Sequence, residues 1–217
     1  MHKKLTKKDW VTMAVTTVLT LLPILFGLAV CGKLPDEMPI HWNAAGEVDG
    51  YASKAVAVFG MPSFLALVNI ICHFVTLADP KHNNTEGKVR TLVFWLIPVI
   101  SIVMNTVCLL VGLGEEISVE RIAPLLVGII FLIIGNYMPK VKQNYTIGIK
   151  VPWALNSEEN WRRTHRLGGW MFMLYGIAMM LSAVITAEFF FGMMLGIILV
   201  ATIVPMIYSY ILYRKGI

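Results

Sequence analysis

The sequence predicts an all-α, polytopic membrane protein with six transmembrane helices and both termini in the cytoplasm. Of its 217 residues, 57% are hydrophobic and only 14% are charged, proportions outside the range of soluble globular domains. Six apolar stretches are long enough to cross the hydrocarbon core of a bilayer as helices, and none of them contains Asp, Glu, Lys or Arg. Lys and Arg gather in alternate connections between the stretches, as the positive-inside rule describes.

The expected spans follow one another along a single membrane domain that covers residues 1–217. Helices are the expected spanning form because lipid offers no partners to backbone N–H and C=O groups, and the stretches lack the alternation of a membrane β-barrel. Residues 32–54 form a long outer segment, and residues 135–169 form a long inner segment. The six spans are 10–31, 55–78, 91–114, 122–138, 169–187 and 189–213.

The distribution of Lys and Arg gives the orientation. The N-terminal segment, the second and fourth connections and the C-terminal segment hold 15 of the 18 Lys and Arg residues, so these segments are expected in the cytoplasm. Eight of the 13 acidic residues lie in the opposite connections, which makes the outer face acidic. The basic excess lies beside the membrane, where anionic headgroups attract it, so membrane lipids and not nucleic acid are the expected partners.

The basic N-terminus before the first apolar stretch is similar to the start of a signal peptide. The stretch is longer than a signal-peptide core and lacks a small-residue cleavage site. We therefore expect it to be retained as the first transmembrane helix.

The outer segment is expected to be extended, with turns. Pro35 and Pro39 prevent the first helix from continuing. Turn formers follow, interleaved with amphipathic side chains that suit the membrane–water boundary; the turn formers are Asn43, Gly46, Asp49 and Gly50, and the boundary residues are His41, Trp42 and Tyr51.

The outer segment also raises the question of a metal site. His41 lies near four acidic residues, which are Asp36, Glu37, Glu47 and Asp49. Their spacing matches no recognised ligand pattern. A structured acidic lid that attracts cationic molecules from outside is the favoured interpretation, and we predict no metal and no cofactor.

The inner segment divides into two parts. Residues 140–155 are rich in turn formers and partly β-prone. A helix is then expected to start with Asn156 as its cap and Glu159 in its third position. We expect this short amphipathic helix to lie along the inner membrane surface and to bend into the fifth span at Gly168 and Gly169.

Charge spacing supports the expected inner helix. Glu158 precedes Arg162 by four residues, and Glu159 precedes Arg163 by four, which is the favourable orientation for helical ion pairs. One face of the same helix is expected to carry Trp161, His165 and Gly168.

Two groups in the inner segment are candidates for binding. The first is either a capping and snorkelling group at a helix end or a docking site for a partner or an anionic headgroup, and it comprises Asn136, Pro139, Lys140, Lys142, Asn144 and Tyr145. The second is either a solvated amphipathic face or a binding face whose histidine titrates near physiological pH, and it comprises Glu158, Arg162, His165 and Arg166.

Polar residues also occur inside the spans. Asn69 and His73 lie four residues apart in the second span, and Ser101 and Asn105 lie four apart in the third. Such groups usually bond across helices, so helix packing is the favoured interpretation and a transport path is the alternative. The spans contain no charged residue, which argues against an ion-coupled transporter. Because the H-E-x-x-H and G-x-S-x-G motifs of hydrolases are also absent, we expect a binding protein and not an enzyme.

The two long segments together resemble the SdpI family of bacterial membrane proteins. The outer segment is similar to a module often found in that family, through Leu34, Pro35, Met38, Pro39, Ile40, His41, Trp42, Asn43, Gly46, Asp49 and Gly50. The inner segment is similar to the family's central signature. Its matching residues are Gly135, Asn136, Met138, Pro139, Lys140, Lys142, Asn144, Tyr145, Ile147, Gly148, Ile149, Lys150, Pro152, Trp153, Glu158, Trp161, Arg162, Arg163, Thr164, His165, Arg166, Gly168 and Gly169.

The resemblance implies an immunity protein of the bacterial plasma membrane, which protects the cell from a secreted, membrane-active peptide toxin. It also implies a signalling role, in which a cytoplasmic repressor is held at the membrane when toxin is present. The toxin is expected at the outer face and the repressor at the inner face. The alternative function is a transporter or channel for a small or peptidic solute. The residues to which the resemblance assigns a functional role are Pro39, His41, Trp42, Asn43, Gly46, Asp49, Gly50, Asn136, Pro139, Lys140, Asn144, Tyr145, Gly148, Pro152, Trp153, Glu158, Trp161, Arg162, His165, Arg166 and Gly168.

Overall fold

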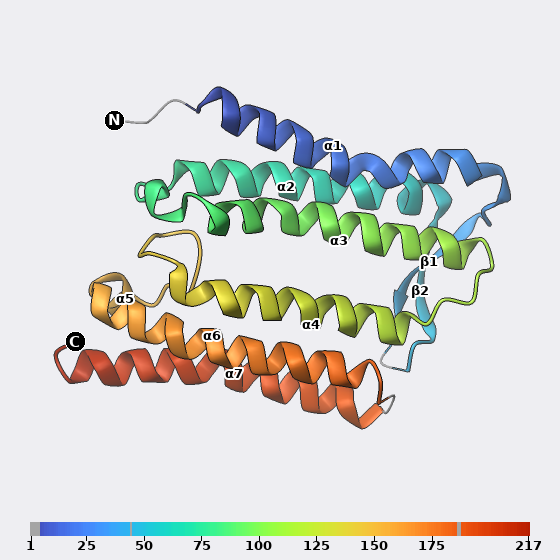
Figure 1. The fold of residues 1–217 in the computed structure, drawn as a ribbon. Coiled ribbons are helices and arrows are strands. Elements are labelled where there is room, and N and C mark those ends of the chain that lie inside the picture. Colours follow the sequence, from blue (N-terminus) through green and yellow to red (C-terminus); the bar gives the residue numbers. More distant parts are fainter. Residues whose placement is uncertain (1–4, 44, 186–187) are drawn as a thin grey trace. The chain divides into compact units, whose positions relative to one another are not determined.

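The computed structural model describes residues 5–43, 45–185 and 188–217, and most of them are helical (Figure 1). The α-helices are α1 (Lys7–Val30), α2 (Met61–Ala78), α3 (Lys88–Gly112), α4 (Val119–Tyr137), α5 (Pro152–Leu155), α6 (Glu158–Ser182) and α7 (Glu188–Arg214). Two strands, β1 (Glu37–Trp42) and β2 (Val48–Ser53), form an antiparallel hairpin. A π-helical turn, Val56–Gly60, leads into α2, and short 3-10 turns occupy Cys31–Lys33, His82–Thr85 and Met138–Lys140.

Five segments of the described chain are long and apolar enough to cross a membrane. They are Lys7–Lys33, Val56–Ala78, Lys88–Gly112, Val119–Lys140 and Met194–Arg214. These segments coincide with five of the six predicted spans. The prediction of a helical, polytopic membrane protein is therefore confirmed.

Helix α6 differs from the predicted fifth span, 169–187. It begins at Glu158, so its first turns carry the charged residues of the inner segment. The uncharged part that the structure describes, 167–182, is shorter than the about 20 residues that a span needs. One continuous helix thus replaces the predicted surface helix that bends into a span, and residues 186 and 187 of that span lie outside the described residues.

The chain forms two compact units, which are described separately. The first unit consists of Met1–Ala78 and Thr91–Val119, and the second consists of Asp79–Arg90 and Glu120–Ile217. The single membrane domain stays a prediction.

Helices α1, α2 and α3 of the first unit are joined by polar contacts. Thr16 Oγ1 lies 3.0 Å from His73 Nε2 and accepts a hydrogen bond of 3.1 Å from Asn69 Nδ2. Ser101 Oγ donates to the carbonyl oxygen of Thr20 over 2.7 Å. These bonds confirm the expected bonding across helices for Asn69, His73 and Ser101, whereas Asn105 bonds to Ser101 within α3.

The β1–β2 hairpin packs an apolar side chain, Met38, into the hydrophobic core of the first unit. Met38 on β1 is fully buried, and Gly112 leaves the space that its side chain fills. The sequence predicted extended chain and turns here, and the structure adds the pairing of the strands. The hydrophobic core beneath the hairpin consists of Leu34, Met38, Ala57, Val58, Cys108 and Leu109.

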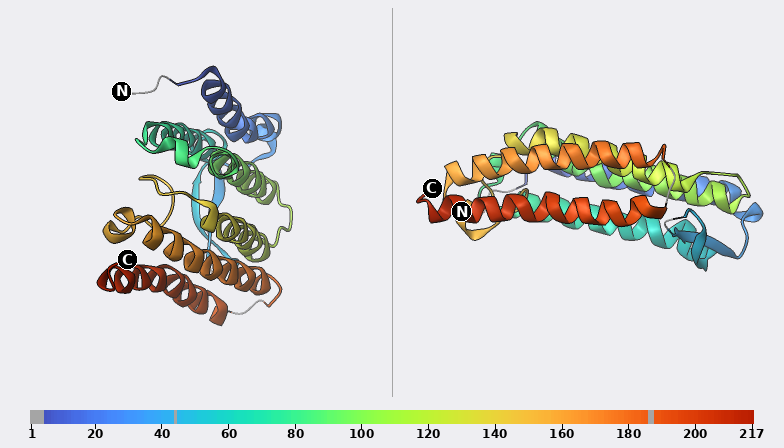
Figure 2. Two further views of the ribbon diagram at one scale, coloured as in Figure 1. Left: turned by 60° about the vertical axis from the view of Figure 1, so that its left-hand side comes forward. Right: turned by 90° about the horizontal axis from the view of Figure 1, so that it is seen from below.

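Helices α6 and α7 of the second unit lie side by side, as the two views in Figure 2 show. Helices α4 and α6 meet through two glycine pairs. A Cβ on Gly135 would lie 2.7 Å from the carbonyl oxygen of Gly169, and a Cβ on Gly128 would lie 2.7 Å from that of Gly176. Side chains do not approach backbone this closely, so glycine is required for the contact. The spacing from 128 to 135 and from 169 to 176 is about two helical turns on each helix.

Substitution of Gly135 by alanine tests this contact. Gly135→Ala should lower the free energy of unfolding by roughly 1–3 kcal/mol, because the new methyl group meets backbone atoms that cannot move aside. The matched control is Gly196→Ala on α7, where a Cβ meets nothing within 4 Å, and which should melt at or slightly above the parent temperature. Thermal unfolding in detergent measures both variants. Equal melting of Gly135→Ala and the parent would contradict the close approach.

Candidate functional site

The inner motif, residues 135–169, is a structured element with a hydrophobic core of its own. It contains the end of α4, the turn Met138–Lys140, helix α5 and the start of α6. The start of α3 also contributes to this core, through Val89. The buried core residues are Val89, Val141, Val151, Ala154 and Trp161. The motif therefore does not behave as a simple connector between helices.

Asn144 closes the loop at the centre of the motif. Its side chain is fully buried. The amide Nδ2 donates to the carbonyl oxygens of Lys142 and Ile147 over 2.8 and 3.0 Å. Its Oδ1 accepts from the N–H groups of Thr146 and Ile147 over 2.9 and 2.6 Å. Only a side chain that both donates and accepts can make this set of bonds, which explains the choice of Asn.

His165 fixes the next turn of the motif to α6. Its Nδ1 lies 2.9 Å from the carbonyl oxygen of Trp161, and its Nε2 accepts from the N–H of Ile149 over 3.0 Å. These two partners assign the neutral tautomer with the proton on Nδ1. The ring stacks on Trp161, with centroids 3.9 Å apart. Burial lowers the pKa of His165 to about 4, so the ring does not titrate near physiological pH as the sequence had suggested.

Two glycines make room for this arrangement. Gly148 has a φ of 114°, a conformation that side chains rarely adopt, and a Cβ there would collide with the ring of His165. A Cβ on Gly168 would lie 2.6 Å from Ile149 Cδ1 and 2.9 Å from Met138 Sδ. Both family-motif glycines are thus required by close packing.

Two aromatic residues anchor the motif to the helices around it. Trp161 Nε1 donates to the carbonyl oxygen of Val141 over 2.8 Å. Trp153, which follows Pro152 at the start of α5, meets Tyr210 of α7 with ring centroids 5.3 Å apart. The motif therefore rests on both α6 and α7.

Sequence reasoning missed three polar residues that hold the motif. Asp79 is nearly fully buried and accepts from the N–H of Tyr145 and the hydroxyl of Thr146, each over 2.8 Å. An acid directly before Pro80 at the end of a span was the available signal. The two other missed residues are Gln143 and Asn160.

Gln143 and Asn160 join segments that are distant in sequence. Gln143 accepts from Lys81 Nζ and donates to the carbonyl oxygens of Ala154 and Leu155. Asn160 donates to the carbonyl oxygen of Ser209 over 2.9 Å and accepts from the Ser209 hydroxyl over 2.5 Å. Asn160 thereby ties α6 to α7.

The start of α6 differs in detail from the prediction. Ser157 is the N-cap in place of Asn156, and its hydroxyl accepts from the N–H of Asn160. Arg162 pairs with Glu159 over 2.7 Å and not with Glu158. The predicted pair of Glu159 with Arg163 is confirmed at 2.6 Å. Hydrogen bonds from Arg163 and then Arg162 lower the pKa of Glu159.

The outward surface of the motif is basic and aromatic. Lys140 Nζ lies 4.6 Å from the ring centroid of Tyr137, and Lys81 Nζ lies 5.5 Å from that of Tyr145. The exposed residues of this surface are Asn136, Pro139, Lys140, Lys142, Tyr145, Lys150, Glu158, Arg162 and Arg166. The structure thus separates the motif into a buried scaffold and an exposed charged surface.

The family-motif residues of the hairpin form a turn scaffold in the first unit. Asn43 Oδ1 accepts from the N–H groups of Ala45 and Glu47, and Gly46 takes a φ of 83°. Across the strands, His41 Nδ1 lies 2.5 Å from Asp49 Oδ1. A Cβ on Gly50 would lie 2.8 Å from His41 Cβ, and Pro39 accepts a bond from the thiol of Cys108. Trp42 packs against the core beneath the hairpin.

Acidic side chains dominate the exposed surface of the hairpin. Asp36, Glu37, Glu47 and Asp49 are all exposed. Among the residues that the structure describes, no three His, Cys, Asp or Glu side chains gather to hold a metal ion. The hairpin motif and the inner motif belong to different units.

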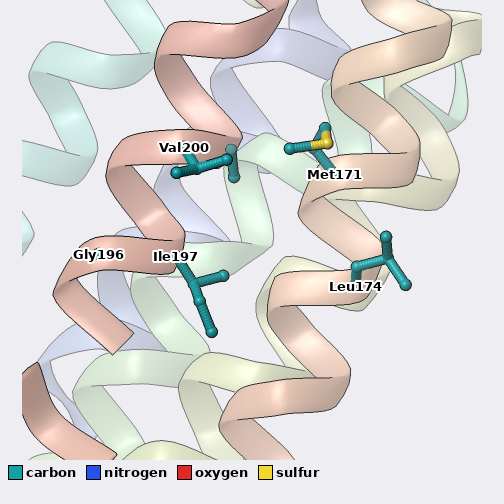
Figure 3. Close-up of a pocket in the computed structure, with 6 residues that line it drawn as sticks. Met171, Leu174, Gly196, Ile197 and Val200 are labelled. Atoms are coloured by element: carbon teal, nitrogen blue, oxygen red, sulfur yellow. The ribbon is translucent and has the colours of Figure 1, made fainter. Parts of the chain in front are cut away.

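An apolar groove lies between α6 and α7 (Figure 3). Its volume is about 450 Å³. The lining residues are Met171, Leu174, Gly196, Ile197, Val200 and Ala201. The groove offers hydrocarbon contact and no polar chemistry.

The burial of His165 should make the second unit sensitive to acid. Its folded pKa of about 4 lies below the ordinary value of 6.5, so the unfolded chain binds a proton more readily. Stability is therefore complete above about pH 6.5 and falls by about 1.4 kcal/mol per pH unit as the pH drops toward 4. Melting temperatures between pH 7 and pH 4 should fall more steeply for the parent than for His165→Gln, which cannot titrate. Parallel curves would show that His165 does not control this dependence.

Comparison with known proteins agrees with the two motifs. Residues 140–209 match the SdpI/YfhL protein family, and residues 18–66 match a domain of unknown function, DUF1648. The chain is 24% identical over 204 residues to the Immunity protein SdpI of Bacillus subtilis (strain 168), and the similarity covers 93% of this chain and 95% of that protein. No solved structure matches the chain. The apolar helices and these matches indicate a multi-pass bacterial membrane protein, which is similar to the SdpI/YfhL family in its inner motif and to an immunity protein along nearly its whole length.

Proposed function

We propose that this protein protects its cell from a secreted, membrane-active peptide toxin. The observation that carries the proposal is the similarity to an immunity protein along 93% of the chain. The acidic hairpin and the lipid-facing helices are the surfaces that we assign to toxin contact. Carboxylates at the membrane surface concentrate cationic peptides by long-range attraction.

We further propose six spans with both termini in the cytoplasm. In this topology α6 is the remaining transmembrane span. The hairpin lies on the outer side of the membrane, and the inner motif lies in the cytoplasm. The excess of Lys and Arg in the inner segments supports the assignment. The hairpin then faces secreted peptides, and the inner motif faces cytoplasmic proteins.

The inner motif supports a second part of the proposal, which is recruitment of a cytoplasmic repressor. Its buried residues form a stiff scaffold, and its exposed residues present Lys142 and Arg166 to the solvent. A rigid basic surface with an exposed tyrosine, Tyr145, has the composition of a protein-binding surface. We assign binding and not catalysis, because His165 is buried as a structural group and His41 pairs with Asp49 across the hairpin.

The alternative of a transporter or channel has less support. The residues on which a path would depend are Asn69, His73 and Asn105. Each is at most 2% exposed and makes hydrogen bonds within the first unit. A water-filled path would expose such side chains.

Single cysteines test the topology. Glu47→Cys in the hairpin and Lys142→Cys in the inner motif, each in a chain whose three cysteines are replaced by serine or alanine, provide a matched exposed pair. A membrane-impermeant maleimide added to intact cells should label Glu47→Cys and leave Lys142→Cys unlabelled until the membrane is permeabilised. Labelling of both sites in intact cells, or of Lys142→Cys alone, would contradict the proposed orientation.

Deletion and variant strains test the function. Cells that lack the gene should lose viability and membrane potential in culture supernatant of the parent strain, while complemented cells survive. Neutralising the hairpin with Asp36→Asn, Glu37→Gln and Glu47→Gln should reduce protection. Neutralising the inner surface with Lys142→Gln and Arg166→Gln should leave survival intact and abolish the transcriptional response to supernatant.

Immunoblots of membrane fractions provide the control for expression. If cells that lack the gene and complemented cells survive equally well in the supernatant, the immunity proposal is wrong. A normal transcriptional response in the Lys142→Gln, Arg166→Gln strain would remove only the proposed role of the inner surface.

A further inference from the structure

A line of buried polar side chains runs between α1, α2 and α3 in the first unit. Each of these side chains is at most 2% exposed. We call this set the polar seam, and it consists of Thr16, Thr20, Asn69, His73, Ser101 and Asn105. Its members lie within helices that are long and apolar enough to cross a membrane.

The hydroxyl groups of the seam donate to backbone. Thr16 Oγ1 lies 3.0 Å from the carbonyl oxygen of Thr12 and 3.1 Å from that of Met13. Thr20 donates to the carbonyl oxygen of Thr16 over 2.8 Å, and Ser101 donates to that of Thr20 over 2.7 Å. Each hydroxyl proton therefore has an acceptor.

The amide N–H groups of the seam are also used. Asn69 Nδ2 donates to Thr16 Oγ1 and Thr17 Oγ1, each over 3.1 Å. Asn105 Nδ2 donates to the carbonyl oxygen and the hydroxyl of Ser101 over 2.9 and 3.1 Å. The donors of both asparagines thus have partners within the unit.

The bonds of Thr16 favour one tautomer of His73. When Thr16 donates its proton to the carbonyl oxygen of Thr12, Thr16 Oγ1 accepts from His73 Nε2, 3.0 Å away. In this arrangement His73 Nε2 carries the proton, and Nδ1 keeps a lone pair.

Three buried atoms of the seam remain without a protein partner among the described residues. They are Asn69 Oδ1, His73 Nδ1 and Asn105 Oδ1. With this tautomer, all three are acceptors. A buried acceptor that stays unsatisfied destabilises the folded state, and lipid supplies no donor.

We propose that the first unit binds water molecules at fixed sites in the polar seam, where they donate hydrogen bonds to Asn69 Oδ1, His73 Nδ1 and Asn105 Oδ1. Buried water typically satisfies polar groups that protein atoms leave unpaired. The chemistry selects a small, neutral donor, because the acceptors are uncharged and are enclosed by the helices. This inference does not depend on the proposed immunity function.

Solid-state NMR of the full-length protein in lipid bilayers tests the proposal. Histidine is labelled with ¹⁵N and ¹³C and phenylalanine with ¹³C, and the His73 signals are assigned by their loss in His73→Phe. We expect a protonated Nε2 and an unprotonated Nδ1 whose ¹⁵N shift is displaced toward that of a hydrogen-bonded acceptor. Magnetisation from water should reach the His73 ring severalfold faster than the ring of Phe94.

Phe94 is a matched internal control. It stacks on His73 with ring centroids 3.6 Å apart and is 3% exposed. Its ring is therefore buried as deeply as that of His73 but has no polar atom that could bind water. A protonated Nδ1, the shift of a free Nδ1 acceptor, or equally slow transfer to both rings would each overturn the proposal. The protonation state and the transfer rates are measured on the parent protein, and His73→Phe serves only to assign the signals.

Discussion

Polar groups that leave water must find hydrogen-bond partners inside the protein, and both units of this structure are organised around that requirement. In the first unit, Thr16 of α1 contacts both Asn69 and His73 of α2. In the second unit, buried Asn144 and buried His165 bind backbone groups of the irregular segment 142–149. Irregular chain beside a membrane is stable only when its N–H and C=O groups are paired in this way. In the loop that carries the inner motif, side chains supply these partners.

The resemblance of the chain to the SdpI family rests mainly on residues that hold the backbone in place. Asn144, Gly148 and His165 are each explained by a bond or a close approach within the inner motif. In the hairpin, Asn43 and Gly46 are explained by the turn. Residues of this kind preserve a shape on which different side chains can be presented. In the proposed function, the exposed residues of the inner motif, such as Lys142 and Arg166, are the ones available to contact a partner.

The apolar spans could be predicted from the sequence because a helix that crosses lipid needs a long run of apolar residues. The extended chain and the turn of the outer segment could be predicted because Pro39 and Gly46 constrain the backbone locally. Contacts between distant segments were not readable. Asp79 gave no sign that it would reach Tyr145, and Asn160 gave none that it would bind Ser209, because a single sequence carries no record of spatial pairing. The helix cap at Ser157 was missed by one residue, since Asn156 and Ser157 are equally good caps by residue type.

The two glycine pairs of α4 and α6 also constrain how the length of this protein can change. One inserted or deleted residue rotates the remainder of a helix by about 100°. Such a change between Gly128 and Gly135, or between Gly169 and Gly176, would turn one glycine of a pair away and bring a side chain against backbone. A single insertion or deletion in either stretch is therefore expected to break the contact between α4 and α6. The loop between these helices is constrained separately, by the buried contacts of Asn144 and His165.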